Sequence, residues 1–96
     1  MNRNDIDKIK DIAKFLSKVC NPKDMENFMV EILTESELDT LSKRWRILQM
    51  LSEGRTQREI AKELKVSLCK VTRGSHILKK HDSISAKYLM SKKFDD

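Results

Sequence analysis

The chain has 96 residues, of which 36% are charged and only 5% aromatic, so a core that it builds alone is small. This length predicts a single domain covering residues 1–96, and the thin core favours dimerisation. We find no signal peptide, transmembrane segment or low-complexity tract, which excludes a membrane protein and predicts a cytoplasmic one.

The net charge of +5 is unevenly distributed along the chain. Residues 43–80 hold eleven Lys or Arg and three Glu, whereas the remaining residues carry more acidic than basic side chains. A basic segment of this kind predicts a surface that neutralises phosphates. The alternative is a solvated surface on which basic residues cluster by chance.

Residue types that carry catalysis or bind metals do not form a recognisable pattern. Cys20 and Cys69 lack metal-ligand spacing and are expected to be reduced and structural. His76 and His81 have no Cys or carboxylate companions at ligand spacing, so no metal site is expected. There is no nucleophile–base pair, paired acid cluster or Gly-rich phosphate loop, so we expect a protein that is not an enzyme.

The first half of the chain shows three amphipathic helical patterns and no strand-like alternation. The first helix is predicted from about Asp5 to Val19, and the second begins near Lys23 or Asp24. The third follows a capping box formed by Thr34 and Glu37 and runs to about Leu51. The apolar stripe of the second helix is predicted to be core or dimer interface and consists of Met25, Phe28, Met29, Ile32 and Leu33. The stripe of the third helix consists of Leu38, Leu41, Trp45, Leu48 and Leu51.

Two short helices with a three-residue break follow, within residues 56–79. Thr56 and Glu59 form a second capping box, and Ser67 is a good N-cap for the next helix. This arrangement predicts a helix-turn-helix, in which the second helix enters the DNA major groove. Lys65 stands in the turn where Gly is usual, at a cost of roughly 1 kcal/mol. An ordinary helical hairpin is the alternative.

A last helix, capped by Asp82 or Ser83, brings the prediction to an all-α subunit of six helices. From Leu33 onward the chain resembles the Trp repressor family of bacteria. The T-R-G-S run inside the recognition helix is the most specific match. The matching pieces cover about half of the chain and are Leu33-Thr34, Arg44-x-Arg46-Ile47, Thr56-Gln57-Arg58-Glu59, Val71-Thr72-Arg73-Gly74-Ser75 and Leu78-Lys79.

The resemblance implies a sequence-specific transcriptional repressor that forms an intertwined homodimer and binds a palindromic double-stranded DNA operator. It also implies L-tryptophan as corepressor, and regulation of genes for tryptophan biosynthesis or transport. In this family, the ligand sets the spacing of the two helix-turn-helix units so that they meet successive major grooves.

The resemblance further assigns roles to individual residues. Arg44 and Arg73 are expected to cover the two faces of the indole ring, and Arg44 also pairs with the ligand carboxylate. Thr34 donates to that carboxylate, and Gly74 leaves room for the ring edge. Leu33, with Glu31, lies in the segment whose backbone carbonyls accept from the ligand ammonium. Without the resemblance, we would interpret the two arginines as phosphate contacts or solvated charges.

Seven positions are expected to face the operator. The contacts to phosphate or sugar position the protein, whereas those at the start of the recognition helix reach base edges. Thr72 suits either role. The phosphate or sugar set is Gln57, Arg58 and Lys79, and the base-reading set is Leu68, Cys69 and Lys70.

Two departures from the family pattern keep other hypotheses open. Ile77 stands where a Ser can lie near the ligand ammonium, so a hydroxyl acceptor is lost. Trp45 replaces a smaller aliphatic residue and is interpreted as core filler near the ligand pocket. The alternatives are a ligand-independent helix-turn-helix regulator and a basic helical module that binds an acidic protein.

Overall fold

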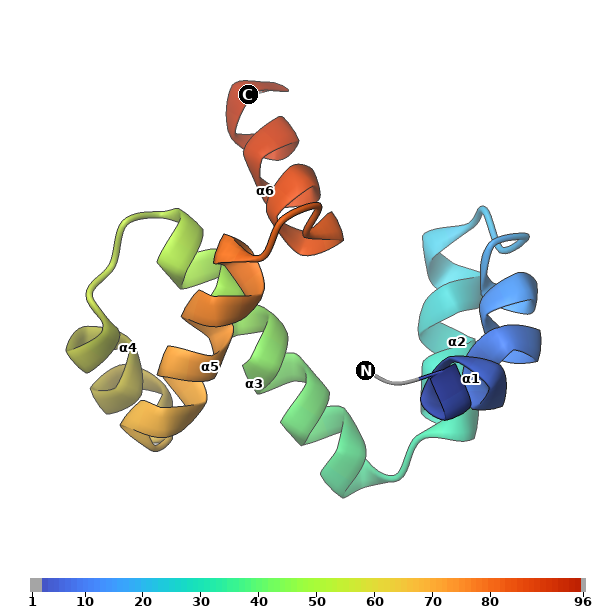
Figure 1. Cartoon of the computed structure of the whole chain (residues 1–96). Coiled ribbons are helices and arrows are strands. Elements are labelled where there is room, and N and C mark those ends of the chain that lie inside the picture. Colours follow the sequence, from blue (N-terminus) through green and yellow to red (C-terminus); the bar gives the residue numbers. More distant parts are fainter. Residues whose placement is uncertain (1–2, 96) are drawn as a thin grey trace. The chain divides into compact units, whose positions relative to one another are not determined.

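The computed structural model describes residues 3–95, and this part of the chain consists of six α-helices without strands (Figure 1). The all-α prediction is therefore confirmed for the described residues. No helix in that range is both long and apolar enough to cross a membrane. The helices are α1 (Arg3–Leu16), α2 (Pro22–Ile32), α3 (Glu35–Ser52), α4 (Gln57–Leu64), α5 (Leu68–Lys79) and α6 (Ile84–Asp95).

The chain forms two compact units, one ending at Leu38 and one beginning at Asp39. We call them the N-terminal unit and the C-terminal unit. The first contains α1 and α2, the second most of α3 and all of α4, α5 and α6. The boundary lies inside α3, so one continuous helix belongs to both units. The single domain remains a prediction.

The predicted end of the first helix was three residues too late, and the second helix begins one residue before Lys23. α1 ends at Leu16 rather than Val19, because the N–H of Val19 donates to the Leu16 carbonyl, three residues back, at 3.2 Å. α2 begins at Pro22, because the Asn21 side chain accepts from the N–H of Lys23 at 2.8 Å. Proline suits the first helical position, since the N–H that it lacks has no partner inside a helix there.

The N-terminal unit buries little of its apolar surface. Phe15 of α1 packs against Phe28 of α2 with ring centroids 5.0 Å apart, but no residue of α2 is buried. No residue of the α2 stripe is fully buried within this unit, and its role as core or dimer interface stays a prediction. Large apolar side chains of this unit that are more than a third exposed include Ile6, Ile9, Ile12, Val30 and Ile32.

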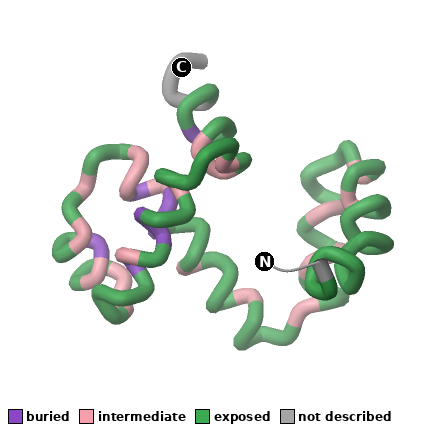
Figure 2. The backbone as a smooth tube through the Cα atoms, viewed as in Figure 1, coloured by how far each residue is buried: buried purple, intermediate pink, exposed green. Residues whose placement is uncertain are grey.

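The core lies in the C-terminal unit, where α3, α4 and α5 meet (Figure 2). Met50, Ile60 and Val71 are fully buried, one from each helix. Partly buried apolar residues surround them. These are Leu51, Ala61, Leu64 and Val66.

The stripe predicted for α3 is buried only in part. Leu48 of the stripe is buried, as are Ile47 beside it and Met50, which the prediction left out, whereas Leu41 and Trp45 are exposed. α4 and α5 cover the side of α3 that holds Ile47, Leu48, Met50 and Leu51. The Trp45 ring instead contacts the ring of Tyr88 in α6, with centroids 6.0 Å apart.

The capping box predicted at Thr34 and Glu37 is confirmed, whereas at Thr56 and Glu59 the structure shows the N-cap bond alone. At the start of α3, Thr34 Oγ1 accepts from the Glu37 N–H at 3.1 Å, and the Glu37 carboxylate accepts from the Thr34 N–H at 2.8 Å. At α4, Thr56 accepts from the Glu59 N–H at 3.2 Å, while the Glu59 carboxylate accepts from Arg55. Each helix therefore begins where its side chains satisfy free backbone N–H groups.

The turn of the helix-turn-helix has the predicted form. Lys65 adopts the left-handed conformation with φ 56° and ψ 46°, and the Val66 N–H donates to the Ala61 carbonyl at 3.1 Å. Ser67 then caps α5 by accepting from the Lys70 N–H. At the last connection Ser83, rather than Asp82, caps α6, since its hydroxyl accepts from a backbone N–H inside that helix.

Lys65→Gly is expected to stabilise the protein by about 0.5–1 kcal/mol, because the strain of a side chain in this conformation outweighs the extra freedom of glycine in the unfolded chain. Chemical denaturation measures the change. Lys65→Ala is the matched control, since it removes the charge but keeps Cβ, and it should give no gain. Equal gains in both variants would attribute the effect to the lysine charge instead.

Candidate functional site

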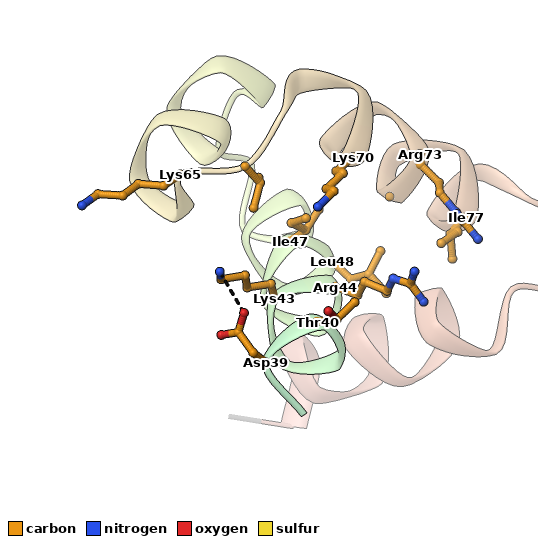
Figure 3. Close-up of a pocket in the computed structure, with 12 residues that line it drawn as sticks. Asp39, Thr40, Lys43, Arg44, Ile47, Leu48, Lys65, Lys70, Arg73 and Ile77 are labelled. Carbon is orange, nitrogen blue, oxygen red and sulfur yellow. Dashed lines mark ion pairs between the residues drawn. The ribbon is translucent and has the colours of Figure 1, made fainter. Parts of the chain in front are cut away.

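A cavity of about 330 Å³ lies in the C-terminal unit between α3 and α5 (Figure 3). Its size is in the range of small-molecule pockets in proteins. The turn of the helix-turn-helix contributes two of its residues, so the cavity touches both the scaffold and the motif. The lining consists of Asp39, Thr40, Lys43, Arg44, Ile47, Leu48, Lys65, Val66, Lys70, Arg73, Gly74 and Ile77.

Gly74 allows the close approach of α5 to α3 at the wall of this cavity. It is buried, and a Cβ added to it would lie 2.7 Å from Cγ2 of Ile47. The Ile47 methyl group is attached at the branched Cβ, which has little rotamer freedom in a helix. The glycine is therefore required by helix packing, whatever it also does for a ligand.

The structure brings Arg44, Arg73 and Gly74 together, three of the five residues predicted to bind the ligand. Arg44 comes from α3 and Arg73 from α5, and their side chains lie on the same side of the pocket as Ile77 (Figure 3). Both arginines are exposed, so their guanidinium planes are accessible. Two such planes suit a flat aromatic ring with a carboxylate, because guanidinium stacks on aromatic faces and pairs with carboxylates.

The pocket is strongly basic. Asp39 is the one carboxylate in its lining, and its oxygen lies 3.0 Å from the ammonium of Lys43. The charge of Asp39 is therefore already paired, and the remaining field favours an anionic group. The basic side chains of the lining are Lys43, Arg44, Lys65, Lys70 and Arg73.

Thr34 and Leu33, the other predicted ligand residues, belong to the N-terminal unit and do not line this pocket. The Thr34 hydroxyl accepts from the Glu37 N–H, which uses one of its lone pairs and leaves its own proton free to donate. Their roles toward a ligand stay predictions.

Sequence reasoning missed several pocket residues and misplaced one. Thr40 and Leu48 lie one helical turn on either side of Arg44, so helical spacing alone would have found them. Lys65 was noted only for its conformation. Trp45 was expected near the pocket but does not line it, because its side chain packs against Tyr88.

The predicted DNA-facing residues occupy the two helices of the motif. Gln57 and Arg58 open α4, whereas Leu68, Cys69 and Lys70 form the exposed first turn of α5. Lys79, also exposed, ends α5, and Thr72 is half-buried. Lys70 was predicted to read bases, but it also lines the pocket.

An ion-pair network that the sequence did not reveal holds the loop before α4. Arg55 donates from Nη2 to Glu63 at 3.0 Å and from Nε to Glu59 at 3.2 Å. The hydrogen bonds to Glu63 and then Glu59 raise the pKa of the Arg55 guanidinium above its usual value. The two carboxylates stand one turn apart on α4, so a single arginine joins the loop to two turns of the helix.

A family model described as Trp repressor protein matches residues 7–93. The chain belongs to the Trp repressor family. Membership identifies it as a non-enzymatic transcription regulator, which confirms the expectation that it is not an enzyme. The resemblance inferred from half of the chain thus extends over most of its length.

Curated relatives agree with this assignment. The chain is 38% identical over 73 residues to a Trp operon repressor homolog of Chlamydia caviae, which covers 75% of this chain and 72% of the relative. It is 40% identical over 65 residues to a Trp operon repressor homolog of Xylella fastidiosa, covering 67% and 71%. No solved structure matches the chain significantly.

Gly74→Ala is expected to destabilise this Trp repressor family member by about 1 kcal/mol. Overpacking against Ile47 costs about 1–3 kcal/mol, and the better helix propensity of alanine returns about 1 kcal/mol. Denaturant unfolding of Gly74→Ala, Ile47→Leu and the double variant forms a cycle. Because leucine has no methyl on Cβ, the double variant should recover stability, whereas additive losses would contradict the close contact.

Proposed function

We propose that this protein is a tryptophan-responsive transcriptional repressor that binds a palindromic operator as a homodimer in the cytoplasm. L-tryptophan occupies the pocket between α3 and α5, with its ring between Arg44 and Arg73. The observation that carries the proposal is the convergence of these two arginines and Gly74 on one basic cavity in a chain of the Trp repressor family.

The position of the pocket supports a switch. Its lining includes Lys70, Arg73, Gly74 and Ile77, all from α5, the helix that enters the major groove in this motif. A ligand changes an equilibrium only if it binds the two states with different affinity. Because the ligand contacts the scaffold helix and the reading helix together, its affinity depends on their arrangement, and so does DNA binding.

The apolar surface of the chain supports a homodimer. The N-terminal unit leaves Ile6, Ile9 and Ile12 of α1 exposed at one helical face, and Val30 and Ile32 of α2 are also exposed. Apolar surface of this extent marks an interaction surface. We propose that the partner's helices cover it in an intertwined dimer, which places two reading heads on half-sites about one helical turn apart, or ~34–36 Å.

Two further ligand residues complete the proposed site. We assign Thr34 to donate to the ligand carboxylate, and the backbone near Leu33 to accept from its ammonium. The regulated genes are proposed to serve tryptophan biosynthesis or transport. These assignments rest on the family pattern.

A second candidate function is DNA binding that does not respond to tryptophan. Ile77 favours it, because this aliphatic residue lines the pocket and offers no acceptor to the ligand ammonium. Both candidates keep the helix-turn-helix, so operator binding with and without tryptophan separates them. Duplexes selected by the protein from a random library in the presence of L-tryptophan supply the operator for that comparison. A basic module that binds an acidic protein would enrich no duplex.

Calorimetric titration with L-tryptophan is expected to show saturable binding at one ligand per subunit. Arg44→Ala and Arg73→Ala should each weaken it about tenfold or more, since each removes a charged partner or a stacking plane. Arg46→Ala is the matched control, because Arg46 lies on α3, outside the pocket lining, and is within 4.0 Å of Glu53. Equal affinity in all three variants would contradict the pocket assignment.

Ile77→Ser is expected to raise tryptophan affinity about tenfold, because its hydroxyl provides an acceptor for the ligand ammonium. The same titration measures it. Ile77→Ala removes the same bulk without adding an acceptor, so it should not gain affinity. If serine and alanine change the affinity alike, the size of the pocket and not the missing acceptor limits binding.

A further inference from the structure

A hydrogen bond joins the two helices of the DNA-binding motif. The hydroxyl of Thr72 on α5 donates to Oε1 of Gln57, the first residue of α4, at 2.8 Å. Both residues are half-buried, so the bond lies at the edge of the contact between the helices. Gln57 and Thr72 were both expected to contact the operator.

The geometry of this bond limits what each side chain can give to DNA. A threonine hydroxyl has one proton, and here that proton points to Gln57. Phosphate oxygens only accept hydrogen bonds, so Thr72 has no donor left for them. The Gln57 amide uses its oxygen in the bond and keeps two N–H donors on Nε2.

We infer that Thr72 is a positioning residue, which acts on DNA through Gln57. Its hydroxyl fixes the amide of Gln57 so that Nε2 faces outward and donates to a phosphate oxygen of the operator. The inference rests on the proposed function, since it requires that the motif binds DNA. It replaces the direct contact that the sequence assigned to Thr72.

The placement of Gln57 fits this role. In a helix-turn-helix, the first helix crosses the DNA backbone while the second enters the major groove. Gln57 begins the first helix, and its neighbour Arg58 is exposed on the same first turn. A long side chain at this position samples several rotamers in isolation, and ordering it on DNA costs entropy. The bond from Thr72 orders it before DNA arrives.

The test is a set of double-variant cycles on the affinity for the duplex selected with L-tryptophan. Gln57→Ala and Thr72→Val are each expected to weaken binding about tenfold, the effect of losing one hydrogen bond to a charged group. In the Gln57→Ala background, Thr72→Val should cause almost no further loss of affinity, because the Gln57 side chain that Thr72 positions is already absent. In the Arg58→Ala background, Thr72→Val should still weaken duplex binding by the full tenfold.

Two conservative variants report on the hydrogen bond itself. Thr72→Ser keeps the hydroxyl and should retain wild-type affinity. Gln57→Glu keeps an acceptor for Thr72 but removes the outward N–H groups, so it should bind at least as weakly as Gln57→Ala. Thermal unfolding of each variant, monitored by circular dichroism, checks that it is folded at the assay temperature.

The outcomes separate the inference from the function on which it rests. Full additivity of Gln57→Ala and Thr72→Val, or wild-type binding by Gln57→Glu, overturns the positioning role while leaving the repressor intact. Equal losses from Thr72→Val in both backgrounds would assign Thr72 a direct contact or a packing role. Absence of duplex binding by the wild-type protein overturns the proposed function and the inference together.

Discussion

The close approach of α5 to α3 at Gly74 is the contact on which the site depends. The 2.7 Å that would separate a Cβ at Gly74 from Cγ2 of Ile47 leaves no room for any other residue without movement. That approach brings Arg73 of α5 over the same cavity as Arg44 of α3. Val71 of the same helix lies in the buried core cluster with Met50, so the packing of α5 on α3 sets both the core and the wall of the pocket.

Local features of the fold were predictable from sequence because their causes are local. The caps at Thr34, Thr56 and Ser67 satisfy backbone N–H groups within three residues, and the conformation of Lys65 follows from its place between two helices. The first connection was predicted less well. The Asn21 side chain, which accepts from the N–H groups of Lys23 and Asp24, decides the start of α2, and helix patterns locate such ends only to within a few residues.

The buried side of α3 and the pocket were predictable only in part, for a different reason. The apolar stripe of α3 contained the buried Leu48, but only the packing of α4 and α5 decides that Met50 is also buried while Leu41 and Trp45 stay exposed. The pocket lining likewise combines residues from α3, α5 and the turn between α4 and α5. Motif matching found Arg44, Arg73 and Gly74, and helical spacing from Arg44 points to Thr40, whereas Lys65 enters only through tertiary placement.

In the proposed function, α5 serves both the ligand pocket and DNA, and this sharing lets a small domain act as a switch. Arg73, Gly74 and Ile77 reach the pocket, and Leu68 and Cys69 remain exposed in the first turn. A rigid helix transmits a displacement at one end to the other with little loss, because its backbone hydrogen bonds resist bending. In the proposed function, a ligand that changes the packing of α5 on α3 therefore re-aims the whole first turn. The Gln57–Thr72 bond and the shared core join α5 to α4, so the two helices of the motif are held together as one reading head.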